Sequence, residues 1–212
     1  MPATPAFCYF DLGNVLLSFS HERMCKQMAE VAGVSAELVR HALFETAGST
    51  RSVQWRFERG DLNVLAVYDH FCETLGVEPN RDELFAAGRD IFEVIEESVA
   101  IVEQLAAAGH QLGIMSNTNT LDWEFVTSGR YPFLNNAFEQ YVLSFEVRSM
   151  KPEPAIYAHA VKLAGAEPGQ VFFTDDRQEN VDGALAVGLD ATLFTTPAKL
   201  REDLQSRGIV LQ

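Results

Sequence analysis

The chain has 212 residues, 47% of them hydrophobic, and a formal net charge of −14 at neutral pH. This length is enough for one or two domains with a buried core. The charge argues against a nucleic-acid-binding protein, because no basic stripe is available to neutralise phosphates. It does not exclude a small anionic substrate, since a bound cation and a few local Lys or Arg residues can reverse the field inside one cleft.

The sequence also lacks the common signals for membranes and secretion. It contains no run of about 18 apolar residues, which a membrane-spanning helix would need. Residues 1–6 lack the basic and then apolar segments of a signal peptide. Cys8, Cys25 and Cys72 are odd in number and far apart, which predicts buried thiols in a reducing compartment. We therefore expect a cytoplasmic protein with no membrane contact.

The first predicted element is a short aromatic strand that ends at Asp11. The run from Phe7 to Phe10 before the loop that holds Gly13 is typical of a buried parallel strand. Open α/β sheets place their ligands at the carboxyl edge of such strands. A carboxylate there can act as a covalent nucleophile or as a metal ligand. The alternative is an aspartate that only initiates a turn before a glycine.

A long helical block follows this strand, from about residue 21 to residue 89. Met24, Met28 and Val31 recur at helical spacing, and glycines at positions 33, 60 and 76 mark helix ends or turns. We interpret the apolar stripes of this block as packing surfaces.

The remainder of the chain alternates between helices and strands. Strands are predicted at 112–116, 141–144, 171–175 and 191–194, and helices at 99–105, 154–164, 178–187 and 197–206. Strands separated by helices pair in parallel and form a doubly wound sheet. We therefore expect an α/β fold in which residues 1–17 and 95–212 form a core and residues 18–94 form an inserted helical cap.

Polar residues also follow two later segments of the core. Ser116-Asn117-Thr118-Asn119 ends the second core strand, where a hydroxyl and amides could bind phosphoryl oxygens or merely cap a helix. Lys151 precedes a proline, so it is held extended and is well placed to direct its ammonium into a cleft. A surface lysine at a helix entrance is the alternative.

The strongest single signal is the pair Asp175 and Asp176 at the end of the apolar strand 171–175. Two adjacent carboxylates repel each other unless a cation or hydrogen-bond donors hold them. Mg²⁺ takes oxygen ligands and keeps several waters, so one or two carboxylates suffice. Asn180, one helical turn later, could orient a carboxylate or a metal-bound water. An acidic first helical turn is the alternative.

These motifs, in this order, resemble those of the haloacid dehalogenase-like hydrolase superfamily. The wording Asp11-Leu12-Gly13-Asn14-Val15 with Ser116-Asn117-Thr118-Asn119 is most similar to its bacterial glucose-1-phosphatase-like branch. The resemblance covers nearly the whole chain, and the ordered set is far more specific than any single motif. It implies a Rossmann-like core, a parallel sheet flanked by helices, with a small all-helical cap after the first strand.

The resemblance also implies roles for individual residues. Asp11 would attack phosphorus and form an aspartyl-phosphate, while Ser116, Asn117 and Lys151 would hold the phosphoryl group. Asp176, with Asp175 beside it, would bind Mg²⁺ together with Asp11 and the carbonyl of Gly13. The expected activity is therefore Mg²⁺-dependent hydrolysis of a small phosphorylated metabolite, with a sugar 1-phosphate as one candidate. This division of roles is physically sensible, because phosphoryl transfer depends mostly on positioning and charge neutralisation.

One departure from the family pattern limits this expectation. Phosphatases of the family carry a second Asp two positions after the nucleophile, and here that position is Gly13. A positioned acid or base contributes ~10²–10⁴ in rate, so we expect a slow or selective phosphatase. His21 or Glu22, just beyond the loop, are candidates to replace the missing acid, although ordinary surface or packing roles are the alternative.

Two other functions remain open from the sequence. A 2-haloacid dehalogenase also lacks the second Asp and works without a metal, a chemistry against which the pair Asp175 and Asp176 argues. A regulatory binding protein that keeps the fold and the metal but has lost useful turnover would also accommodate Gly13.

Overall fold

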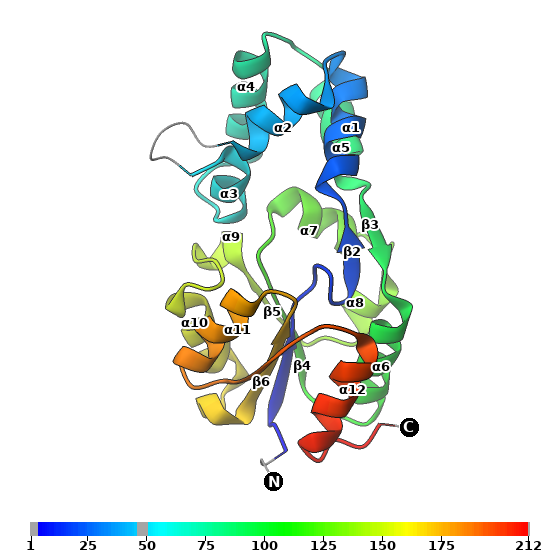
Figure 1. Ribbon diagram of the computed structural model, residues 1–212, viewed down its shortest axis with the longest axis vertical. Helices are drawn as coiled ribbons and strands as arrows, with labels where there is room; N and C mark the ends of the chain where they lie inside the picture. The colour runs from blue at the N-terminus through cyan, green and yellow to red at the C-terminus, as the bar shows by residue number, and fades with distance from the viewer. Residues whose placement is uncertain (1–3, 46–50, 212) are drawn as a thin grey trace.

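The computed structural model describes residues 4–45 and 51–211, and its core is a five-stranded sheet. The strand order is β5-β4-β1-β6-β7 and every pairing is parallel, which confirms the predicted α/β fold (Figure 1). The strands are β1 (Phe7–Phe10), β4 (Leu112–Ser116), β5 (Gln140–Leu143), β6 (Val171–Asp175) and β7 (Asp190–Leu193).

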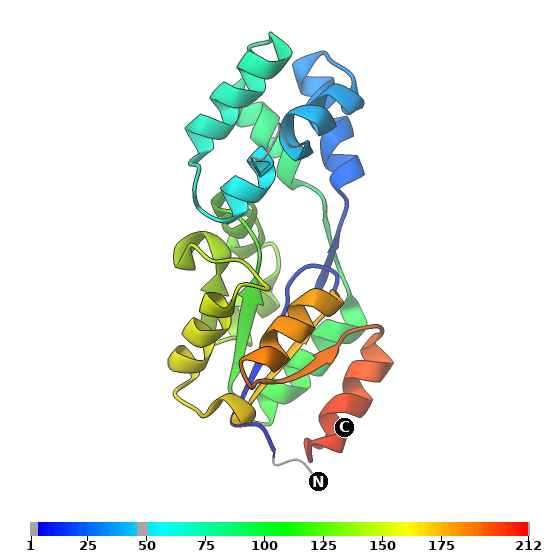
Figure 2. The ribbon, with the colours of Figure 1, turned by 60° about the vertical axis from the view of Figure 1, so that its left-hand side comes forward.

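Helices cover both faces of this sheet (Figure 2). Side chains of β1 alternate between the faces, so that Cys8 and Phe10 join one hydrophobic cluster while Phe7 and Tyr9 join another. The first cluster packs against α6 (Glu96–Ala107), α8 (Pro132–Asn136) and α12 (Pro197–Ser206). The second packs against α10 (Pro154–Ala164) and α11 (Gln178–Ala186). β1 is the central strand of the sheet, so residues at the ends of its two neighbours, β4 and β6, can lie close to the end of β1.

In the described part of segment 18–94, residues 18–45 and 51–94, five helices pack around a hydrophobic cluster of their own. They are α1 (His21–Ala32), α2 (Ala36–Phe44), α3 (Val53–Glu58), α4 (Val64–Leu75) and α5 (Arg81–Arg89). Side chains of Ser20, Ser35 and Asn63 accept hydrogen bonds at the N-termini of α1, α2 and α4, as polar N-caps do. Left-handed glycines at 33 and 76 end α1 and α4, as the sequence predicts.

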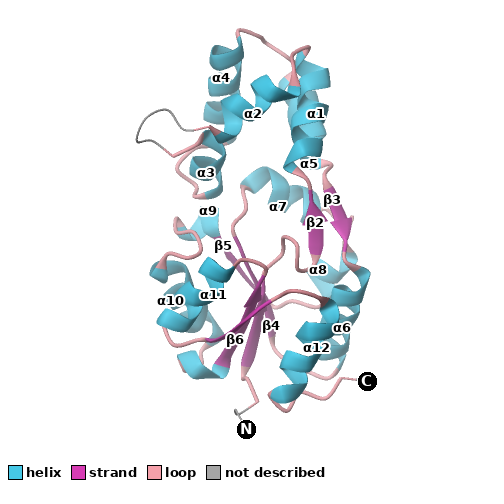
Figure 3. Cartoon of the chain, viewed as in Figure 1, coloured by secondary structure: helices cyan, strands magenta, loops and turns pink. Residues whose placement is uncertain are grey.

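A two-stranded antiparallel ribbon, not predicted from the sequence, joins this helical block to the core (Figure 3). It consists of β2 (Leu17–Phe19) and β3 (Phe92–Val94), with Ser18 paired to Glu93. The ribbon lies where the chain leaves the core and where it returns. Strands of three residues give too short an alternation to be distinguished from loop in the sequence.

The remaining elements lie in the loops at the carboxyl edge of the sheet or between core elements. They are α7 (Thr120–Thr127), α9 (Ser144–Val147) and the short 3₁₀ helix Pro168–Gln170. The predicted bounds of α10 and α12 are correct, and each helix begins with a proline in its first turn. Ser144 was predicted to end the strand 141–144, but it begins α9 instead. Within residues 4–45 and 51–211, no helix is long and apolar enough to cross a bilayer.

Candidate active site

The parallel register brings the predicted site residues together at one edge of the sheet. Phe10 is paired with both Ile114 and Thr174, so Asp11 lies beside the ends of β4 and β6. The backbone N–H of Asp11 donates to the carbonyl of Thr174 at 3.0 Å, which continues the ladder to Asp11. The expectation that these motifs meet at neighbouring strand ends is therefore confirmed.

Lys151 is buried among the carboxylates rather than lying on the surface. Its Nζ lies 2.7 Å from Asp11 Oδ1 and 2.5 Å from Asp175 Oδ2, and it also donates to the backbone carbonyl of Met115 at 2.9 Å. The residue as a whole is 4% exposed. A buried ammonium requires such partners, because burial of an unpaired charge is very costly. The alternative of a surface lysine at a helix entrance is wrong.

Asp175 holds this lysine in place. One of its oxygens binds Lys151, and Oδ1 accepts hydrogen bonds from the backbone N–H of Arg177 and from Asn180 Nδ2, both at 2.9 Å. The spacing of Asn180 predicted that it could orient a carboxylate, and the structure places it on Asp175. Because both oxygens of Asp175 are engaged, its main effect is to fix the ammonium of Lys151.

Asp11, Asp175 and Asp176 form a cluster that fits a divalent cation. Each offers a carboxylate oxygen, and these oxygens lie within 4.8 Å of one another. Asp176 is partly exposed and its Oδ2 accepts a hydrogen bond from Asn14 Nδ2 at 3.0 Å. A set of hard oxygen donors beside one buried ammonium is suited to Mg²⁺. The residues present therefore fit the cation that the motifs imply.

Asn14 has a role in this geometry that the sequence reasoning missed. Its backbone adopts a left-handed conformation, with φ of 55°, and its N–H donates to the carbonyl of Leu17 at 2.7 Å. Asn tolerates this conformation better than most residues. The sharp turn directs its amide to Asp176. An asparagine directly after Gly13 was the available signal.

Burial is the largest influence on the pKa values of Asp11 and Lys151, the ion pair at the centre of the site. It raises the pKa of Asp11 to about 7, against the effect of the Lys151 ammonium, while Asp175 and Asp176 add to the rise. Burial works against the charged form of Lys151, but Asp11 and Asp175 outweigh it and hold the pKa of Lys151 above its usual value. A divalent cation among these carboxylates would favour the ionised, nucleophilic form of Asp11.

Ser116 and Asn117 lie at the end of β4 beside this cluster. Ser116 is 3% exposed and lines the same cavity as Asp11. The side chain of Asn117 bonds the backbone of Lys151 in both directions, donating to its carbonyl at 2.9 Å and accepting from its N–H at 2.8 Å. Asn117 thus positions Lys151, and a direct contact with substrate stays a prediction.

A cavity of about 410 Å³ opens above these groups, between the strand ends and the helical block. We call it the catalytic cavity. Core residues of its lining include Asp11, Gly13, Ser116, Lys151 and Asp176. The segment 18–94 contributes further lining side chains, among them Phe19, His21, Arg51, Gln54, Trp55 and Glu58. Apart from His21, the sequence could not identify these contributors, because their place in the cavity depends on how the helical block packs over the sheet.

The two residues considered as replacements for the missing acid behave differently. His21 lines the catalytic cavity, but its ring packs against Phe19 and Phe44 at 5.0 and 4.7 Å between centroids. Burial lowers the pKa of His21, and Arg40 lowers it further. Glu22 is exposed and pairs with Lys26 at 2.6 Å. His21 is therefore a packing residue and Glu22 a surface residue.

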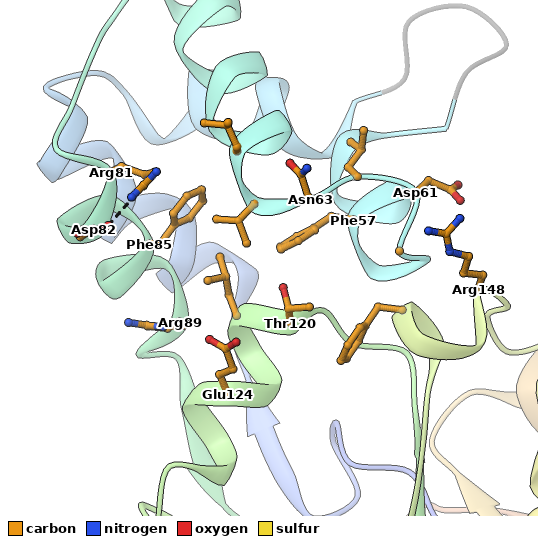
Figure 4. A pocket seen from close by; sticks show the side chains of 16 residues that line it. Phe57, Asp61, Asn63, Arg81, Asp82, Phe85, Arg89, Thr120, Glu124 and Arg148 are labelled. Atoms are coloured by element: carbon orange, nitrogen blue, oxygen red, sulfur yellow. Dashed lines mark hydrogen bonds and ion pairs between the residues drawn. The ribbon is translucent and has the colours of Figure 1, made fainter.

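A second cavity, of about 880 Å³, lies on another side of α3 (Figure 4). Arg148 and Asp61 lie at one end, and Arg81 and Arg89 at the other, with Phe57 between them (Figure 4). The three carboxylates that could hold a cation, those of Asp11, Asp175 and Asp176, do not line this second cavity. The larger cavity is therefore separate from the group of residues that can perform chemistry.

The sequence of residues 7–188 matches the family model described as haloacid dehalogenase-like hydrolase. The chain belongs to this family. The match spans both segments of the core and the helical block between them, and it confirms the resemblance drawn from the four motifs. The glucose-1-phosphatase-like branch stays a prediction.

Solved structures of this haloacid dehalogenase-like fold are similar over nearly the whole chain. A HAD family enzyme from Bacteroides thetaiotaomicron is 22% identical, with a TM-score of 0.76 over 90% of this chain and 93% of that one. A structure of that enzyme contains magnesium and inorganic phosphate. The L-2-haloacid dehalogenase of Xanthobacter autotrophicus is 19% identical, with a TM-score of 0.60 over 95% of this chain and 83% of that one. At these identities the likeness establishes the fold.

A relative whose name states an activity matches a shorter stretch of the chain. Flavin mononucleotide hydrolase 1 of Arabidopsis thaliana is 37% identical over 59 residues, which are 28% of this chain. The matched stretch spans only 24% of that hydrolase. This haloacid dehalogenase-like hydrolase thus shares a local segment with a flavin mononucleotide hydrolase.

Proposed function

We propose that this hydrolase is a Mg²⁺-dependent phosphatase that acts on a small phosphate monoester through an aspartyl-phosphate. The observation that carries the proposal is the contact of Lys151 Nζ with Asp11 Oδ1 at 2.7 Å, beside two further carboxylates. An ammonium and a cation site around one buried carboxylate form the charge arrangement that phosphoryl transfer requires. A metal-free dehalogenase has no need of the partly exposed carboxylate of Asp176 beside Asp11.

In this proposal the chemistry begins at Asp11. Lys151 and the N–H of Leu12 both contact Oδ1, at 2.7 and 2.8 Å, so Oδ2 is the oxygen that attacks phosphorus. Lys151 and the hydroxyl of Ser116 hold the phosphoryl oxygens in line for attack. Attack by water on the aspartyl-phosphate then releases inorganic phosphate and restores Asp11.

Asp11, Asp176 and the carbonyl of Gly13 would hold the Mg²⁺, with Asp175 beside them. When bound, Mg²⁺ neutralises charge on the transferring phosphoryl group. Asn14 steadies Asp176 through its 3.0 Å hydrogen bond. Asp175 serves the same centre by orienting Lys151, since its oxygens are already engaged.

The catalytic cavity sets the size of the substrate. A volume of about 410 Å³ lies toward the small end of ordinary ligand pockets, which favours a compact metabolite such as a sugar phosphate. We also propose that residues 1–17 and 95–212 act as the catalytic core and that residues 18–94 act as a specificity cap. The cap places Trp55 and Arg51 in the cavity, with Arg51 5.2 Å from the ring centroid of Trp55.

The test measures phosphate release from a panel of sugar phosphates and acyl phosphates, with Mg²⁺ and with a chelator. Phosphate release is expected in the presence of Mg²⁺ and not in the presence of the chelator. Asp11→Asn should lower the rate of release by at least ~10³-fold, because this change removes the nucleophile. Asp69→Asn, on the exposed surface of α4, is the matched control. Activity that survives Asp11→Asn would overturn the proposal, as would chloride release from 2-chloropropionate in the presence of a chelator.

A further inference from the structure

The loop that follows Asp11, residues 12–15, holds no proton donor for the leaving group, and its geometry leaves little room for one. Position 13, where the family's second Asp would stand, is glycine. A Cβ built there would lie 2.8 Å from Cε1 of Phe19, closer than real Cβ atoms approach a neighbour. The ring of Phe19 also lines the catalytic cavity. An acid for this reaction must therefore come from another element.

Glu58, the last residue of α3, brings a carboxyl group into the catalytic cavity from the opposite side. It lines this cavity together with Asp11, Lys151 and Asp176. Its Oε1 accepts a hydrogen bond from Gln54 Nε2 at 2.8 Å, and Gln54 lies one helical turn earlier on the same helix. No ion pair to Glu58 is present among residues 4–45 and 51–211.

The backbone around Glu58 is docked tightly against the core. The buried hydroxyl of Ser144 donates to the carbonyl of Glu58 at 2.6 Å, and its oxygen accepts the N–H of Thr118 at 3.0 Å. Ser144 thereby connects α3 to the loop that follows Ser116. Arg59 adds an ion pair to Glu153, with 3.5 Å between Nε and Oε1. These contacts fix Glu58 relative to the strand ends.

Gly60 brings this segment still closer to the core. Its φ is 79°, and a Cβ at this position would lie 2.3 Å from the carbonyl oxygen of Phe145. Backbone of the cap and backbone of α9 are thus in direct contact two residues beyond Glu58. Such contact allows a cap side chain to be placed with the accuracy that proton transfer demands.

The surroundings of Glu58 raise the pKa of its carboxyl into the neutral range. Burial raises the pKa of Glu58 to about 7; the Gln54 hydrogen bond opposes the rise, Asp122 adds to it and Arg177 opposes it. The charged or titratable groups that line the cavity with Glu58 are Asp11, His21, Arg51, Asp122, Lys151, Asp176 and Arg177. A pKa near the working pH suits a group that must both give and take a proton.

Asp122 is the other carboxyl group beyond the metal cluster that lines the catalytic cavity among the described residues. Its Oδ2 accepts from Asn119 Nδ2 at 2.6 Å, and burial raises its pKa to about 6. It also lines a small apolar cavity of about 40 Å³ together with Met24 and Met28, behind the catalytic one. Glu58 lines the catalytic cavity and not this small one, so we take Glu58 as the candidate acid.

We propose that Glu58 is the general acid and base of the reaction, supplied by the cap in place of the residue missing at Gly13. This inference rests on the proposed phosphatase function. As Asp11 attacks and the bond from phosphorus to the leaving oxygen breaks, the carboxyl of Glu58 gives its proton to that oxygen and the alcohol departs. The resulting carboxylate then takes a proton from the water that attacks the aspartyl-phosphate. Phosphate leaves, Asp11 is free, and Glu58 is protonated again.

The test compares kcat/KM for an alkyl phosphate, whose leaving oxygen needs a proton, with kcat/KM for p-nitrophenyl phosphate, whose leaving oxygen does not. Glu58→Gln should lower the first by ~10²-fold and the second by less than about threefold, as expected for loss of a leaving-group acid. Glu124→Gln, in the second cavity, is the matched control and should leave both values unchanged. A purely structural role for Glu58 would lower both values equally and would overturn the inference.

The wild-type enzyme provides a readout that needs no variant. Each kcat/KM value is first corrected for the separately measured ionisation of that substrate's own phosphate group. The ratio of the two corrected values cancels enzyme ionisations that affect both substrates alike, such as that of Asp11. It should fall as pH rises through the pKa of Glu58, about 7, because the acid is then lost. A ratio independent of pH would contradict the inference. If Asp11→Asn silences the enzyme while Glu58→Gln leaves the ratio unchanged, the role of Glu58 is wrong and the phosphatase assignment stands; if Asp11→Asn remains active, both fail.

Discussion

The ring of Phe19 occupies the space that a side chain at position 13 would need, since a Cβ on Gly13 would lie 2.8 Å from Cε1 of Phe19. Phe19 ends β2, and its ring stacks near Phe92 at 6.3 Å between centroids, so the ribbon holds it in place. From the sequence alone, Gly13→Asp would be expected to restore the missing acid. The structure indicates that a single substitution instead creates a steric conflict.

We therefore predict that Gly13→Asp alone does not raise turnover on alkyl phosphates. In a Glu58→Gln background, Gly13→Asp together with Phe19→Ala should exceed Phe19→Ala by ~10-fold or more, because the ring no longer blocks the new carboxyl and Glu58 no longer supplies the proton. Steady-state kinetics of all three variants give the comparison. A strongly activated Gly13→Asp single variant would mean that Phe19 moves aside freely, contrary to this prediction.

Removal of the buried ammonium should damage both stability and activity. Lys151→Met leaves Asp11 and Asp175 buried without their cation, and breaking a buried ion pair in this way costs about 3–5 kcal/mol. Urea denaturation in the presence of a chelator measures the loss. Added Mg²⁺ should reduce this loss of stability, because the cation neutralises the same carboxylates. Lys162→Met, at an exposed position near the end of α10, should change stability by less than about 0.5 kcal/mol.

The contact of Gly60 with the backbone of Phe145 predicts a specific sensitivity to a methyl group. Gly60→Ala should lower stability and phosphatase activity together, since Cβ would lie 2.3 Å from a carbonyl oxygen. Gly76→Ala is a matched comparison: φ is 66°, but nothing lies within 4 Å. It should cost about 1–2 kcal/mol, the penalty of the left-handed backbone alone, and leave kcat/KM unchanged. Equal effects of the two changes on kcat/KM would contradict the proposed docking.

Protonation of Glu58 should also appear in stability. Its pKa rises from 4.5 to about 7 on folding, so the folded state increasingly resists ionisation between these two values. Below pH 4.5 the group is neutral in both states and costs nothing; above pH 7 it is charged in both and the cost is complete. Glu58→Gln should therefore match the wild-type Tm at pH 4 and exceed it at pH 8.

Glu22 provides a control of opposite sign for this measurement. Its pKa is lowered by the hydrogen bond and charge of Lys26, so its contribution is present at high pH and is lost as pH falls. Glu22→Gln should thus never raise the Tm at pH 8. If Glu58→Gln gave the same Tm difference at every pH, the rise in the pKa of Glu58 on folding would be contradicted.

Much of the fold was predictable because the local signals agreed. Pro154 and Gly165 bracket α10, and the aromatic run before Asp11 could only be a buried strand. The β2–β3 ribbon was not predictable, since its strands have three residues each and pair across 73 or more positions of sequence. Helices α7 and α8 were also missed, because they are short and lie in loops.

The residues of the candidate site likewise include some that the sequence predicts and one that it does not. Asp11, Ser116, Lys151 and Asp175 belong to parallel strands or their following loops, and parallel strand ends must meet at one edge of a sheet. Glu58 follows no such rule. Its place in the cavity depends on the docking of α3 against Ser144, a contact 86 positions apart in sequence. Sequence spacing carries no information about a meeting of this kind.

The β2–β3 ribbon, where the chain both leaves and re-enters the core, has an evolutionary consequence. The segment 18–94, which lies over the leaving group of the substrate in our proposal, enters and leaves the core through the adjacent strands β2 and β3. It can therefore be replaced by another insertion while the sheet edge that binds the phosphoryl group is unchanged. If the acid belongs to that segment, a new insertion would bring its own proton donor along with its own specificity. Descendants of such a scaffold could then change substrate and reactivity in a single recombination event.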